Sequence, residues 1–429
     1  MSRLASVLET VIGADAPLAY AAYDGSTAGQ RDDPVGRITV RDRRAFSHMI
    51  QAPGELGLAR AYVSGALDLE GDLHDTMVLL ARETVGGLTW AERLVVLQSV
   101  LAMAGPAVLL PTPPPPEEVR PGPLWGGWSG LRHTLGRDAR AISHHYDVSN
   151  RFYEWILGPT MAYTCAVYPT ADATLEQAQI EKVDLVCRKL GLRAGQRLLD
   201  VGCGWGTMVR HAASEYGAEV LGVTLSAQQA AWGQAMLARD GLTGRAEIRH
   251  ADYRSVAEGD FDAISSIGLT EHIGRAQLPA YAAFLASRLK PRGRLLNHCI
   301  TRPESGGTSV RDKGFINRYV FPDGELEGVG EIVSVLQNAG LEIRHEENLR
   351  EHYARTCTTW AANLEAHWRE AVAEVGEGRA RVWRLYLTGS ALGFEQRRIE
   401  LHQVLAVKTE GGQAAMPLRP DFTRRATVS

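Results

Sequence analysis

The stretch Arg197-Leu-Leu-Asp-Val-Gly-Cys-Gly-Trp-Gly206 decides the fold of this chain. Its apolar start predicts a buried strand, three alternating glycines follow at Gly202, Gly204 and Gly206, and a helical pattern begins at Thr207. Glycine accepts backbone angles that are closed to other residues, and it lets a ligand lie against bare main chain. A strand, a glycine turn and a helix N-terminus form the nucleotide-binding corner of a doubly wound α/β sheet. We therefore expect a nucleotide-type ligand here rather than an empty turn.

The glycine spacing indicates which nucleotide. Dinucleotide sites use G-x-G-x-x-G, followed about 20 residues later by an acid for the ribose. Here the spacing is G-x-G-x-G, and the next predicted strand, at 218–225, ends without a carboxylate. An acid directly before the first glycines, as at Asp200, is typical of sites for S-adenosylmethionine (SAM), beside the amino-acid end of that cofactor. These features favour SAM over a nicotinamide cofactor.

Length and composition limit the class of protein. The 429 residues suggest more than one domain. A hydrophobic content of 45% with 22% charged residues is ordinary for a soluble globular protein, and a net charge of -4 gives no reason to expect a nucleic acid partner. The five cysteines are odd in number and lack C-x-x-C spacing, so we expect a reducing cytoplasm and neither a disulfide framework nor a metal site.

No targeting or membrane-spanning segment is predicted. The first residues lead into no apolar core with a cleavage site, so a signal peptide is not expected. The longest apolar run, at 94–110, is interrupted by Gln98, Ser99, Gly105 and Pro106. It falls short of the roughly 18 to 20 apolar residues that cross a bilayer.

The chain divides into three predicted parts. Residues 1–105 predict a smaller α+β domain without a catalytic cluster, which we interpret as an accessory domain for lipid presentation or dimerisation. Residues 106–124 contain Pro111-Thr-Pro-Pro-Pro-Pro116 and predict a semi-rigid linker. Residues 125–429 are expected to form the SAM-dependent methyltransferase domain.

Strand and helix patterns alternate through this third part, which predicts a mostly parallel sheet. The predicted strands are 197–201, 219–225, 246–250, 261–267 and 293–299, with a late pair at 341–346 and 399–407. An amphipathic helix precedes them at 175–190, with Ile180, Val183, Cys187 and Leu190 on one face. The long helical stretch 350–396 is expected to form a lid over the strand ends, where such sheets bind ligands.

Basic and aromatic residues are interleaved at 124–140, where Trp125 and Trp128 precede Arg132 and Arg137. This pattern suits a membrane surface with anionic headgroups. A solvated basic helix with two packed tryptophans explains the pattern equally well. Both interpretations stay open on the sequence alone.

Several motifs occur together in an order that points to one family: His145-Tyr-Asp147, Tyr163-Thr-Cys-Ala166, Leu199-Asp-Val-Gly-Cys-Gly-Trp-Gly206, Gly222-Val-Thr-Leu-Ser-Ala-Gln-Gln229, Glu271-His-Ile-Gly274 and His352-Tyr-Ala-Arg-Thr356. As a set they resemble the SAM-dependent cyclopropane fatty acid synthases, including the mycolic acid cyclopropane synthases. The resemblance covers about residues 140–409 and implies a class I SAM-methyltransferase, with its Rossmann-like α/β sheet. The first domain is similar to the N-terminal extension of the bacterial fatty-acyl-phospholipid members.

The resemblance implies methyl transfer from SAM to a cis double bond, of the oleoyl type, in an acyl chain of a membrane phospholipid. An alkene is a weak nucleophile, and its attack on the methyl group leaves a carbocation in the chain. The site therefore needs a firmly held SAM, a dry apolar channel with faces that tolerate a cation, and a base for one proton.

The resemblance also assigns cofactor residues. Asp200, Gly202 and Gly204 match the cofactor loop, and Tyr163 and Thr164 match residues over the methionine end. The remaining matches are Thr224, Ser226 and Gln229 in the T-L-S-x-x-Q segment and Asp252 opposite the adenine amino group. For Asp252, a solvated loop aspartate is an equally good interpretation.

Members of this family hold a bicarbonate ion as the base, and five residues here match its pocket: Cys165, Glu271, His298, the backbone of Ile300, and Tyr353. His, Tyr and Cys donors can hold an anion, and a carboxylate can pass its proton onward. Glu271 and His298 also come at or just after the ends of predicted strands, where site residues are expected in this architecture.

Tyrosine rings are candidates for the faces that stabilise the cation, because each attracts positive charge by roughly 0.5 to 2 kcal/mol when desolvated. Tyr146, Tyr163, Tyr319 and Tyr353 are the candidates. Ordinary core packing is the alternative for each of them, and it is least favoured for Tyr353.

The residue before Glu271 is Thr270, where cyclopropane-forming members usually carry Phe. The cation can close a cyclopropane by losing a proton from the added methyl, or a hydride shift before that loss can leave a methylene branch. The chain resembles most the actinobacterial 10-methylene branch of the family, so we expect a product of the 10-methylene stearoyl type, with the cyclopropane as the alternative. The sequence shows no flavin or NADPH domain, so reduction to a methyl branch would need a separate reductase.

Two other functions compete with this one. A small-molecule O- or N-methyltransferase needs the cofactor loop, but it does not need Cys165, Glu271, His298 and Tyr353 together. A non-catalytic SAM- or lipid-binding module predicts an eroded base pocket, whereas here the pocket is complete by residue type. We expect a cytoplasmic homo-oligomer with peripheral contact to an anionic membrane surface.

Overall fold

The computed structural model describes residues 4–12, 16–30, 32–83, 90–119, 149–305, 314–321 and 324–423. The chain folds into two compact units. The first comprises Met1–Trp128, Arg311–Pro322 and His367–Leu392, and the second comprises Ser129–Val310, Asp323–Ala366 and Gly393–Ser429. The motif at 145–147, with Tyr146, and the whole basic and aromatic stretch at 124–140 lie outside the described residues.

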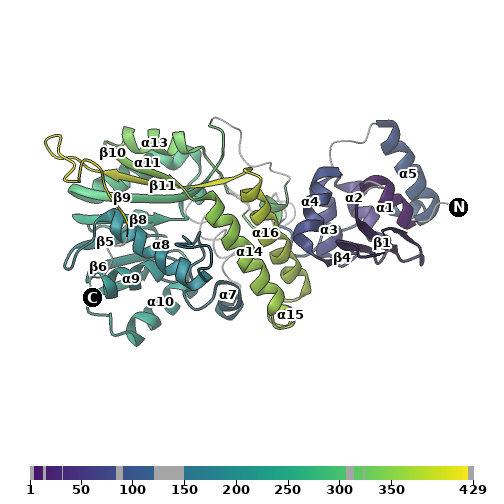
Figure 1. Cartoon of the computed structure of the whole chain (residues 1–429), viewed down its shortest axis with the longest axis horizontal. Helices are drawn as coiled ribbons and strands as arrows, with labels where there is room; N and C mark the ends of the chain where they lie inside the picture. Colours follow the sequence, from purple (N-terminus) through teal and green to yellow (C-terminus); the bar gives the residue numbers. More distant parts are fainter. Residues whose placement is uncertain are drawn as a thin grey trace. The chain divides into compact units, whose positions relative to one another are not determined.

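The first unit is an α+β fold, as expected (Figure 1). Its four-stranded sheet has the order β2-β1-β3-β4, in which only β1 and β3 are parallel. The elements in chain order are α1 Leu4–Ile12, β1 Leu18–Ala22, β2 Thr27–Gly29, β3 Gly36–Val40, α2 Arg44–Gln51, α3 Glu55–Val63, β4 Leu67–Gly71, α4 Leu73–Glu83, α5 Trp90–Ala104 and the short helix η1 Pro106–Leu109.

The described part of the expected linker, 106–119, is packed into the first unit instead of bridging two domains. Val108 on η1 is fully buried in its core. Glu118 is also buried, and it accepts two hydrogen bonds of 2.6 Å from the guanidinium of Arg60 on α3. Prolines lack a donor and already have a restricted φ, so an extended proline segment can lie along a core without leaving amide groups unpaired.

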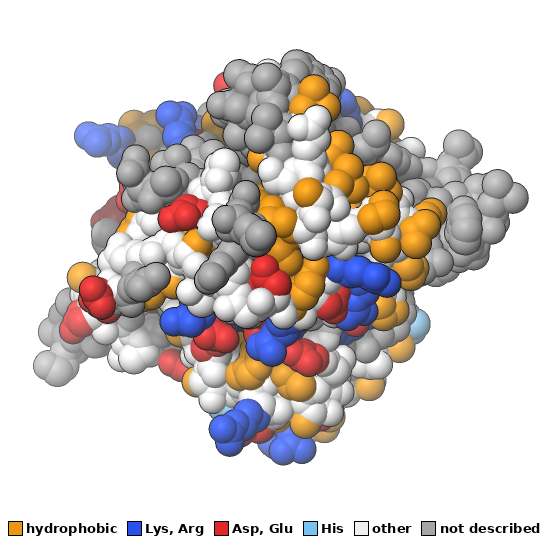
Figure 2. Space-filling view, turned by 90° about the vertical axis from the view of Figure 1, so that its right-hand side faces the viewer, with side chains coloured by type: hydrophobic (Ala, Val, Ile, Leu, Met, Phe, Trp, Pro, Cys, Tyr) orange, Lys and Arg blue, Asp and Glu red, His pale blue; other side chains and the backbone are white. Residues whose placement is uncertain are grey.

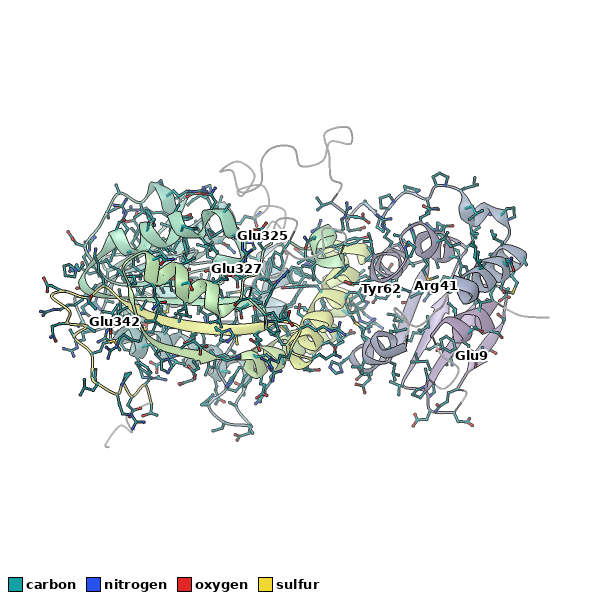
Figure 3. The ribbon with its side chains drawn as sticks, turned by 90° about the horizontal axis from the view of Figure 1, so that it is seen from above. Glu9, Arg41, Tyr62, Glu325, Glu327 and Glu342 are labelled. Atoms are coloured by element: carbon teal, nitrogen blue, oxygen red, sulfur yellow. The ribbon has the colours of Figure 1, made fainter. Side chains whose placement is uncertain are left out.

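Later parts of the chain complete this unit, so its boundary differs from the expected one at residue 105. Helix α16 (Glu377–Glu395) carries Arg381, which donates to the carbonyl oxygens of Tyr62 (3.0 Å) and Leu67 (3.3 Å). Figure 3 shows Tyr62 in this unit, together with Arg41, which pairs with Asp68. Helices α12 (Phe315–Tyr319) and α15 (Trp368–Val375) also belong to this unit.

The surface of the first unit has an apolar character on the side seen in Figure 2, where many hydrophobic side chains are visible. Its large exposed hydrophobic residues, among those the structure describes, are Tyr23, Leu94, Leu109 and Leu110. Three of these four come from α5, η1 and the residue directly after η1.

The second unit contains a seven-stranded sheet of the order β10-β11-β9-β8-β5-β6-β7. The five strands β7, β6, β5, β8 and β9 are parallel, and β11 and β10 are added antiparallel at one edge. Their bounds are β5 Arg197–Val201, β6 Glu219–Thr224, β7 Ala246–His250, β8 Phe261–Ile267, β9 Leu289–Thr301, β10 Glu342–Asn348 and β11 Glu400–Val407. The sheet is the class I Rossmann-like α/β fold that the sequence predicts.

Helices cover both faces of this sheet (Figure 1). One face packs against α8 (Leu175–Leu190), α9 (Thr207–Glu215) and α10 (Ala227–Arg239). The other face packs against α11 (Leu278–Arg288) and α13 (Val329–Asn338). Neighbouring residues of a strand point to opposite faces, so Leu198 packs with the first group of helices and Leu199 with the second.

Helix α8 is defined by its ends. Thr174 and Gln177 form a capping box at its start, and Gly191 ends it in the left-handed conformation. The predicted apolar face is correct for Val183, Cys187 and Leu190, but Ile180 is 45% exposed. The buried face instead includes Lys182 and Lys189, which are 3% and 1% exposed. Two lysines of this helix are thus directed into the interior.

The stretch expected to form a lid is helical but is divided between the units. Helix α14 (Arg350–Ala366) belongs to the second unit, where Asn363 donates to the carbonyl of Ile156 on α7 (Asn150–Leu157) at 2.9 Å. Helix α15 and most of α16 belong to the first unit. Among the described residues, no helix is both long and apolar enough to cross a membrane.

Candidate active site

The glycine turn after β5 has the backbone geometry that only glycine adopts easily. Gly202, Gly204 and Gly206 have φ values of +77°, +55° and +83°. A Cβ on Gly206 would lie 2.3 Å from Cδ1 of Ile248, so a side chain is excluded there by packing. A Cβ on Gly204 would meet nothing within 4 Å. The open space beside Gly204 leaves room for a ligand against the main chain.

A pocket opens at this turn, at the carboxyl ends of β5, β6 and β8. Eight of the nine residues predicted to bind the cofactor line it: Tyr163, Thr164, Asp200, Gly202, Gly204, Thr224, Gln229 and Asp252. Ser226 lies outside the lining and caps α10, where its hydroxyl accepts from the amide of Gln229 at 3.3 Å. Thr224 is joined to this cap by a 2.7 Å bond to the side chain of Gln229.

Asp200 is the buried acid of this pocket. One of its carboxyl oxygens accepts a 2.6 Å hydrogen bond from Ser265 on β8, and the other is buried without a partner among the described residues. Burial raises the pKa of Asp200 to about 6, against the lowering effects of Ser265 and Lys182. A buried acceptor beside the bare main chain of Gly204 fits the ammonium of an amino-acid ligand such as the methionine end of SAM.

Asp252 is engaged by its own neighbour. It caps the short helix η3 (Tyr253–Ser255), accepting from the amide of Arg254 at 2.8 Å, and its other oxygen pairs with the guanidinium of Arg254 at 2.7 Å. The residue lines the pocket, as predicted. Its position at an adenine ring stays a prediction.

Lys182 is a pocket residue that the sequence interpretation missed. It reaches the lining from α8, and burial lowers its pKa to about 8, while Asp200 acts to raise it. Its positive charge also affects the pKa of the buried Cys165 and His298. The available signal was periodicity, because Ala178, Lys182 and Val186 are spaced for one helix face.

Glu271 is a second buried acid, and it lies on the short helix η4 (Thr270–His272). Oε1 of Glu271 accepts a 2.7 Å hydrogen bond from the amide of Ile300 on β9, while Oε2 is buried without a partner in the described part of the chain. Desolvation raises the pKa of Glu271 to about 7. The carboxyl group thus titrates close to neutral pH, as an acid–base group must.

The segment that carries Glu271 is held by a neighbouring loop. The amide of Glu325 donates to the carbonyl of Glu271 at 3.0 Å. Arg275 binds the same loop through Glu327 (2.8 Å), and its amide donates to the carboxylate of Glu325 (2.9 Å). Figure 3 shows Glu325 and Glu327 close together. These contacts fix the backbone from which the Glu271 side chain starts.

His298 lies two residues before Ile300 on the same strand, so their side chains share one face of the sheet. Its Nδ1 is 3.1 Å from Nε2 of Gln403 on β11, and its Nε2 is buried without a partner in the described structure. Burial, with Lys182 and Lys189, lowers the pKa of His298 well below its usual value. The imidazole is therefore neutral.

Cys165 and Tyr353 both bind the carbonyl of Leu349, directly before the start of α14. The thiol of Cys165 donates to the carbonyl of Ala166 at 3.2 Å and to that of Leu349 at 3.7 Å. The amide of Tyr353 donates to the same carbonyl of Leu349 at 3.1 Å. Burial raises the pKa of the Cys165 thiol, so it remains protonated and can donate.

An aromatic chain connects the glycine turn with α14. Successive ring centroids lie 4.7, 5.7, 5.3, 6.0 and 4.4 Å apart in the order Trp205, Tyr153, Tyr163, Trp360, Tyr353 and Phe394. Two of the four tyrosines predicted to face a cation, Tyr163 and Tyr353, belong to this chain. Tyr319 belongs to the first unit, where its hydroxyl donates to Glu118 at 3.1 Å, so its observed contacts are structural.

Thr270 has a buried polar partner. Its hydroxyl donates to the side-chain oxygen of Asn297 at 2.7 Å, and Asn297 in turn donates to the sulfur of Cys299 at 3.3 Å. The hydroxyl that distinguishes this position from the usual Phe is thus satisfied within the protein.

Comparisons with known proteins agree with this geometry. Residues 133–404 match the model of the mycolic acid cyclopropane synthetase family. The chain belongs to this family. A probable fatty acid methyltransferase of Mycobacterium tuberculosis is 53% identical over 410 residues, which cover 94% of each chain. A probable fatty acid methyltransferase of Pseudomonas putida is 39% identical over 395 residues, covering 91% of this chain and 92% of the other.

A solved relative extends the comparison to structure. The crystal structure of a mycolic acid cyclopropane synthase with SAH and CTAB superposes with a TM-score of 0.59 at 32% identity, covering 63% of this chain and 98% of the other. The mycolic acid cyclopropane synthetase family was predicted from the motif set, and this prediction is confirmed. The present family member is a SAM-dependent methyltransferase.

Proposed function

We propose that this enzyme transfers a methyl group from SAM to the cis double bond of an unsaturated acyl chain, of the oleoyl type, in a membrane phospholipid. The product would be a methylene-branched chain of the 10-methylene stearoyl type. The observation that carries the proposal is the buried carboxyl group of Glu271, which keeps one oxygen unpartnered close to the cofactor pocket. Transfer to an alkene ends with the loss of a proton from carbon, and this group is suited to the relay of that proton.

SAM, when bound, supplies an electrophilic methyl group on a sulfonium. In this chain Asp200 would hold the ammonium of its methionine end, and Gly202 and Gly204 would let it lie against the main chain. Tyr163 and Thr164 line the same pocket and would cover that end. Lys182 carries a positive charge beside Asp200 and would suit the cofactor's carboxylate.

In the first chemical step the alkene electron pair forms a bond to the methyl carbon, and the electrons of the broken carbon–sulfur bond stay on sulfur. This leaves a carbocation in the acyl chain. The ring of Tyr353 stacks on Phe394 with centroids 4.4 Å apart and makes an edge-to-face contact with Trp360 at 6.0 Å. An aromatic face stabilises a desolvated cation by about 0.5 to 2 kcal/mol and would therefore lower the barrier to this step.

The proton lost from the new methyl group must leave a dry site. A bicarbonate ion is the proposed acceptor, held by the thiol of Cys165, the imidazole of His298, the amide of Ile300 and the hydroxyl of Tyr353. The Ile300 amide donates to Glu271 in this structure, so Glu271 would have to share or release that donor. Glu271, with a pKa near 7, would carry the proton onward.

The methylene product requires a hydride shift before the proton is lost. The sequence feature that favours this route is Thr270, a smaller and polar neighbour of Glu271 where cyclopropane-forming members usually carry Phe. The alternative is that the first cation closes a cyclopropane directly. Both products gain one carbon and two hydrogens, so they differ in structure and not in mass.

Contact with an anionic membrane surface belongs to the same proposal. It is supported by Leu94, Leu109 and Leu110, which are 51–62% exposed on the first unit. The proposal also includes peripheral association with the membrane and assembly as a homo-oligomer in the cytoplasm. Any later reduction of the product would need a separate reductase. A small-molecule O- or N-methyltransferase and a non-catalytic SAM- or lipid-binding module are the competing functions.

Expression in a bacterium that lacks its own cyclopropane synthase, fed with oleate, tests the proposal. Gas chromatography–mass spectrometry of fatty acid methyl esters should reveal acyl chains heavier by one CH2, and Glu271→Gln provides the matched inactive control. Mild catalytic hydrogenation then distinguishes the products, because a methylene branch takes up two hydrogens and a cyclopropane resists. If soluble enzyme yields neither product, the competing functions replace this one.

A further inference from the structure

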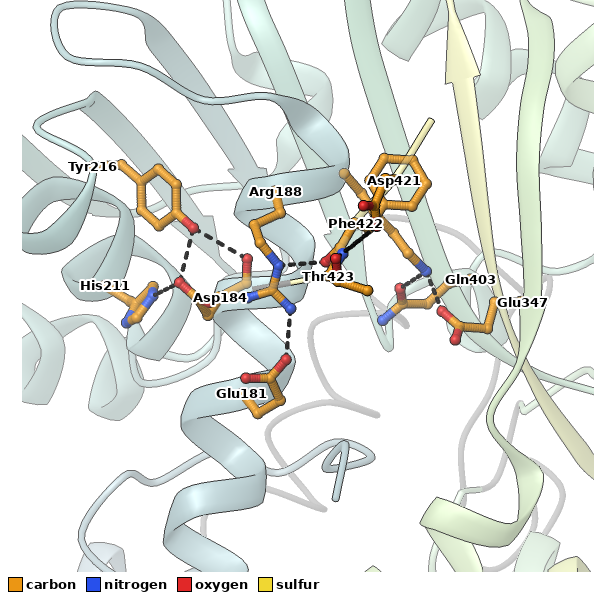
Figure 4. A network of polar contacts seen from close by, with 11 residues as sticks. Glu181, Asp184, Arg188, His211, Tyr216, Glu347, Gln403, Asp421, Phe422 and Thr423 are labelled. Atoms are coloured by element: carbon orange, nitrogen blue, oxygen red, sulfur yellow. Dashed lines mark hydrogen bonds and ion pairs between the residues drawn. The ribbon is translucent and has the colours of Figure 1, made fainter. Parts of the chain in front are cut away.

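A chain of buried polar groups leads from the surface to the imidazole of His298. Glu347 on β10, whose side chain is 38% exposed, pairs with the ammonium of Lys189 on α8. Lys189 also donates to Oε1 of Gln403 at 2.7 Å, and Nε2 of Gln403 lies 3.1 Å from Nδ1 of His298. Figure 4 shows Gln403 and Glu347 side by side on neighbouring strands, joined through contacts drawn as dashed lines.

The groups in this chain have little freedom to move. Gln403 and His298 are 0% exposed and face each other in the register of β11 and β9. Lys189 is 1% exposed, and its ammonium lies 6.0 Å from the ring centre of Phe422. The carbonyl of Phe422 accepts a 2.7 Å bond from Arg188, so the C-terminal segment is fastened over Lys189 (Figure 4).

The chemistry of the lysine ammonium fixes which atoms donate and which accept along this series of hydrogen bonds. A lysine ammonium has three donors and no acceptor, so the atom of Gln403 that faces it must be the carbonyl oxygen. The amide nitrogen of Gln403 then faces His298 and can only donate. Nδ1 of His298 must therefore accept, and a neutral imidazole that accepts at Nδ1 carries its single proton on Nε2.

We infer that Lys189 and Gln403 are positioning residues, which hold His298 in the tautomer protonated at Nε2. This nitrogen is the atom of His298 that is buried without a partner among the described residues. In this tautomer Nε2 is a hydrogen-bond donor without a partner in the described structure, and it cannot act as a base. The inference rests on the proposed function only for the identity of the ligand that receives this hydrogen bond.

The tautomer decides what the site can bind. A donor at His298 and a carboxyl oxygen at Glu271 suit a ligand that has both an anionic oxygen and a hydroxyl, and bicarbonate is such an oxyacid anion. The opposite tautomer would place a lone pair at Nε2, which repels an anionic oxygen. Lys189 thus contributes to the site through Gln403, without contact to the ligand.

Nuclear magnetic resonance of protein with ring-15N histidine tests the inference directly. Long-range 1H–15N correlation distinguishes the two neutral tautomers and the imidazolium, and His298→Gln identifies the signals of this residue by subtraction. Wild-type enzyme should show the neutral form protonated at Nε2. In Gln403→Leu and Lys189→Met the signals should move toward the other tautomer or a mixture of both.

Activity and a matched control complete the test. Turnover of Gln403→Leu should fall by about 10²- to 10³-fold, the range for the loss of one preorganised hydrogen-bond donor, with SAM affinity unchanged. Thr301→Val is the control, because Thr301 forms a 2.6 Å bond with His402 on the opposite face of the same strand pair. This variant loses a buried hydrogen bond but should keep both the His298 signals and turnover.

The outcomes separate this inference from the proposed function. Wild-type His298 protonated at Nδ1, or charged, overturns the inference whatever the enzyme's activity. Signals unchanged in both Gln403→Leu and Lys189→Met also overturn it. The expected tautomer in an enzyme that modifies no acyl chain would support the inference and refute the proposed function.

Discussion

The cofactor pocket differs from the buried side chains Glu271 and His298 in which groups supply its chemistry. The pocket is centred on one turn of the main chain, where Gly202 and Gly204 have positive φ values. Glu271 and His298 are side chains of separate elements, and one polar atom of each, Oε2 of Glu271 and Nε2 of His298, lacks a partner in the described structure.

The difference affects how each region responds to substitution. The main-chain groups of the glycine turn are set by local geometry, so a substitution outside the cofactor pocket should leave them little changed. Buried polar side chains are costly to desolvate, and their pKa values depend on every neighbour. We therefore expect substitutions to separate cofactor binding from turnover.

The largest effect is expected for Glu271→Gln. Glutamine can still accept from the amide of Ile300 but cannot carry a proton, so turnover should fall by about 10²- to 10⁴-fold. SAM affinity, measured by calorimetry, should be unchanged. Turnover close to that of the wild type, measured as methylated acyl esters, would remove Glu271 from the proton relay.

Asp200→Ala should instead weaken the binding of SAM in the cofactor pocket. Removing one partner of a buried charge interaction costs about 2 to 5 kcal/mol, which corresponds to a loss of SAM affinity of about 30- to 5,000-fold. Asp200→Asn, which keeps an acceptor for Ser265, is the control for folding. Retained affinity in Asp200→Ala would contradict the cofactor assignment.

The pH dependence of stability should reveal the desolvated Glu271. Its pKa is about 7 in the folded protein, above the ordinary value of 4.5, so it favours folding fully below pH 4.5 and loses that contribution as pH rises through 7. Between pH 4.5 and pH 8 the wild type should lose about 3 kcal/mol relative to Glu271→Gln. A difference in unfolding free energy between the two proteins that stays constant from pH 4.5 to pH 8 would contradict this burial effect.

Tyr353 offers a smaller test of the cation hypothesis. Tyr353→Phe keeps the ring that stacks on Phe394, whereas Tyr353→Leu removes it. A ring face worth about 0.5 to 2 kcal/mol predicts turnover about 2- to 30-fold lower for the Leu variant than for the Phe variant. Equal turnover in the two variants would exclude a role for the ring, and the Phe variant alone reports on the hydroxyl.

Ser226→Ala should have the smallest effect. Its hydroxyl caps α10, so its loss should cost about 1 kcal/mol of unfolding free energy, measured by denaturant titration. SAM affinity should change little, because Ser226 lies outside the pocket lining. A large loss of affinity at unchanged stability would restore the cofactor role that the sequence predicts.

The comparison also explains what could be predicted from the sequence. The glycine turn and its acid are contiguous, so the fold and most of the cofactor pocket follow from one stretch. Gln403 was missed because its importance depends on the register of β11 against β9, which pairs it with His298 across 105 residues. Lys182 was missed because lysine usually marks a solvent-exposed helix face, whereas here a pocket polar enough to receive it lies behind the helix.

The domain boundary was missed for a similar reason. A run of prolines predicts an extended segment, but it does not say whether that segment is free or packed. Here Glu118, a few residues after the prolines, is fixed by Arg60. The contribution of 367–392 to the first unit depends on contacts such as that of Arg381 with Tyr62, which no local pattern reveals.

The discontinuous first unit has a consequence for synthesis in the cell. Its early part, with α1 to α5, leaves the ribosome long before Arg381, and translation at ~5–20 residues per second separates the two by on the order of tens of seconds. The sheet of the second unit also waits for its last strand, β11, which lies between β10 and β9. Both cores therefore stay incomplete on the nascent chain until residues 377–407 emerge, and chaperones have a long period in which to bind it.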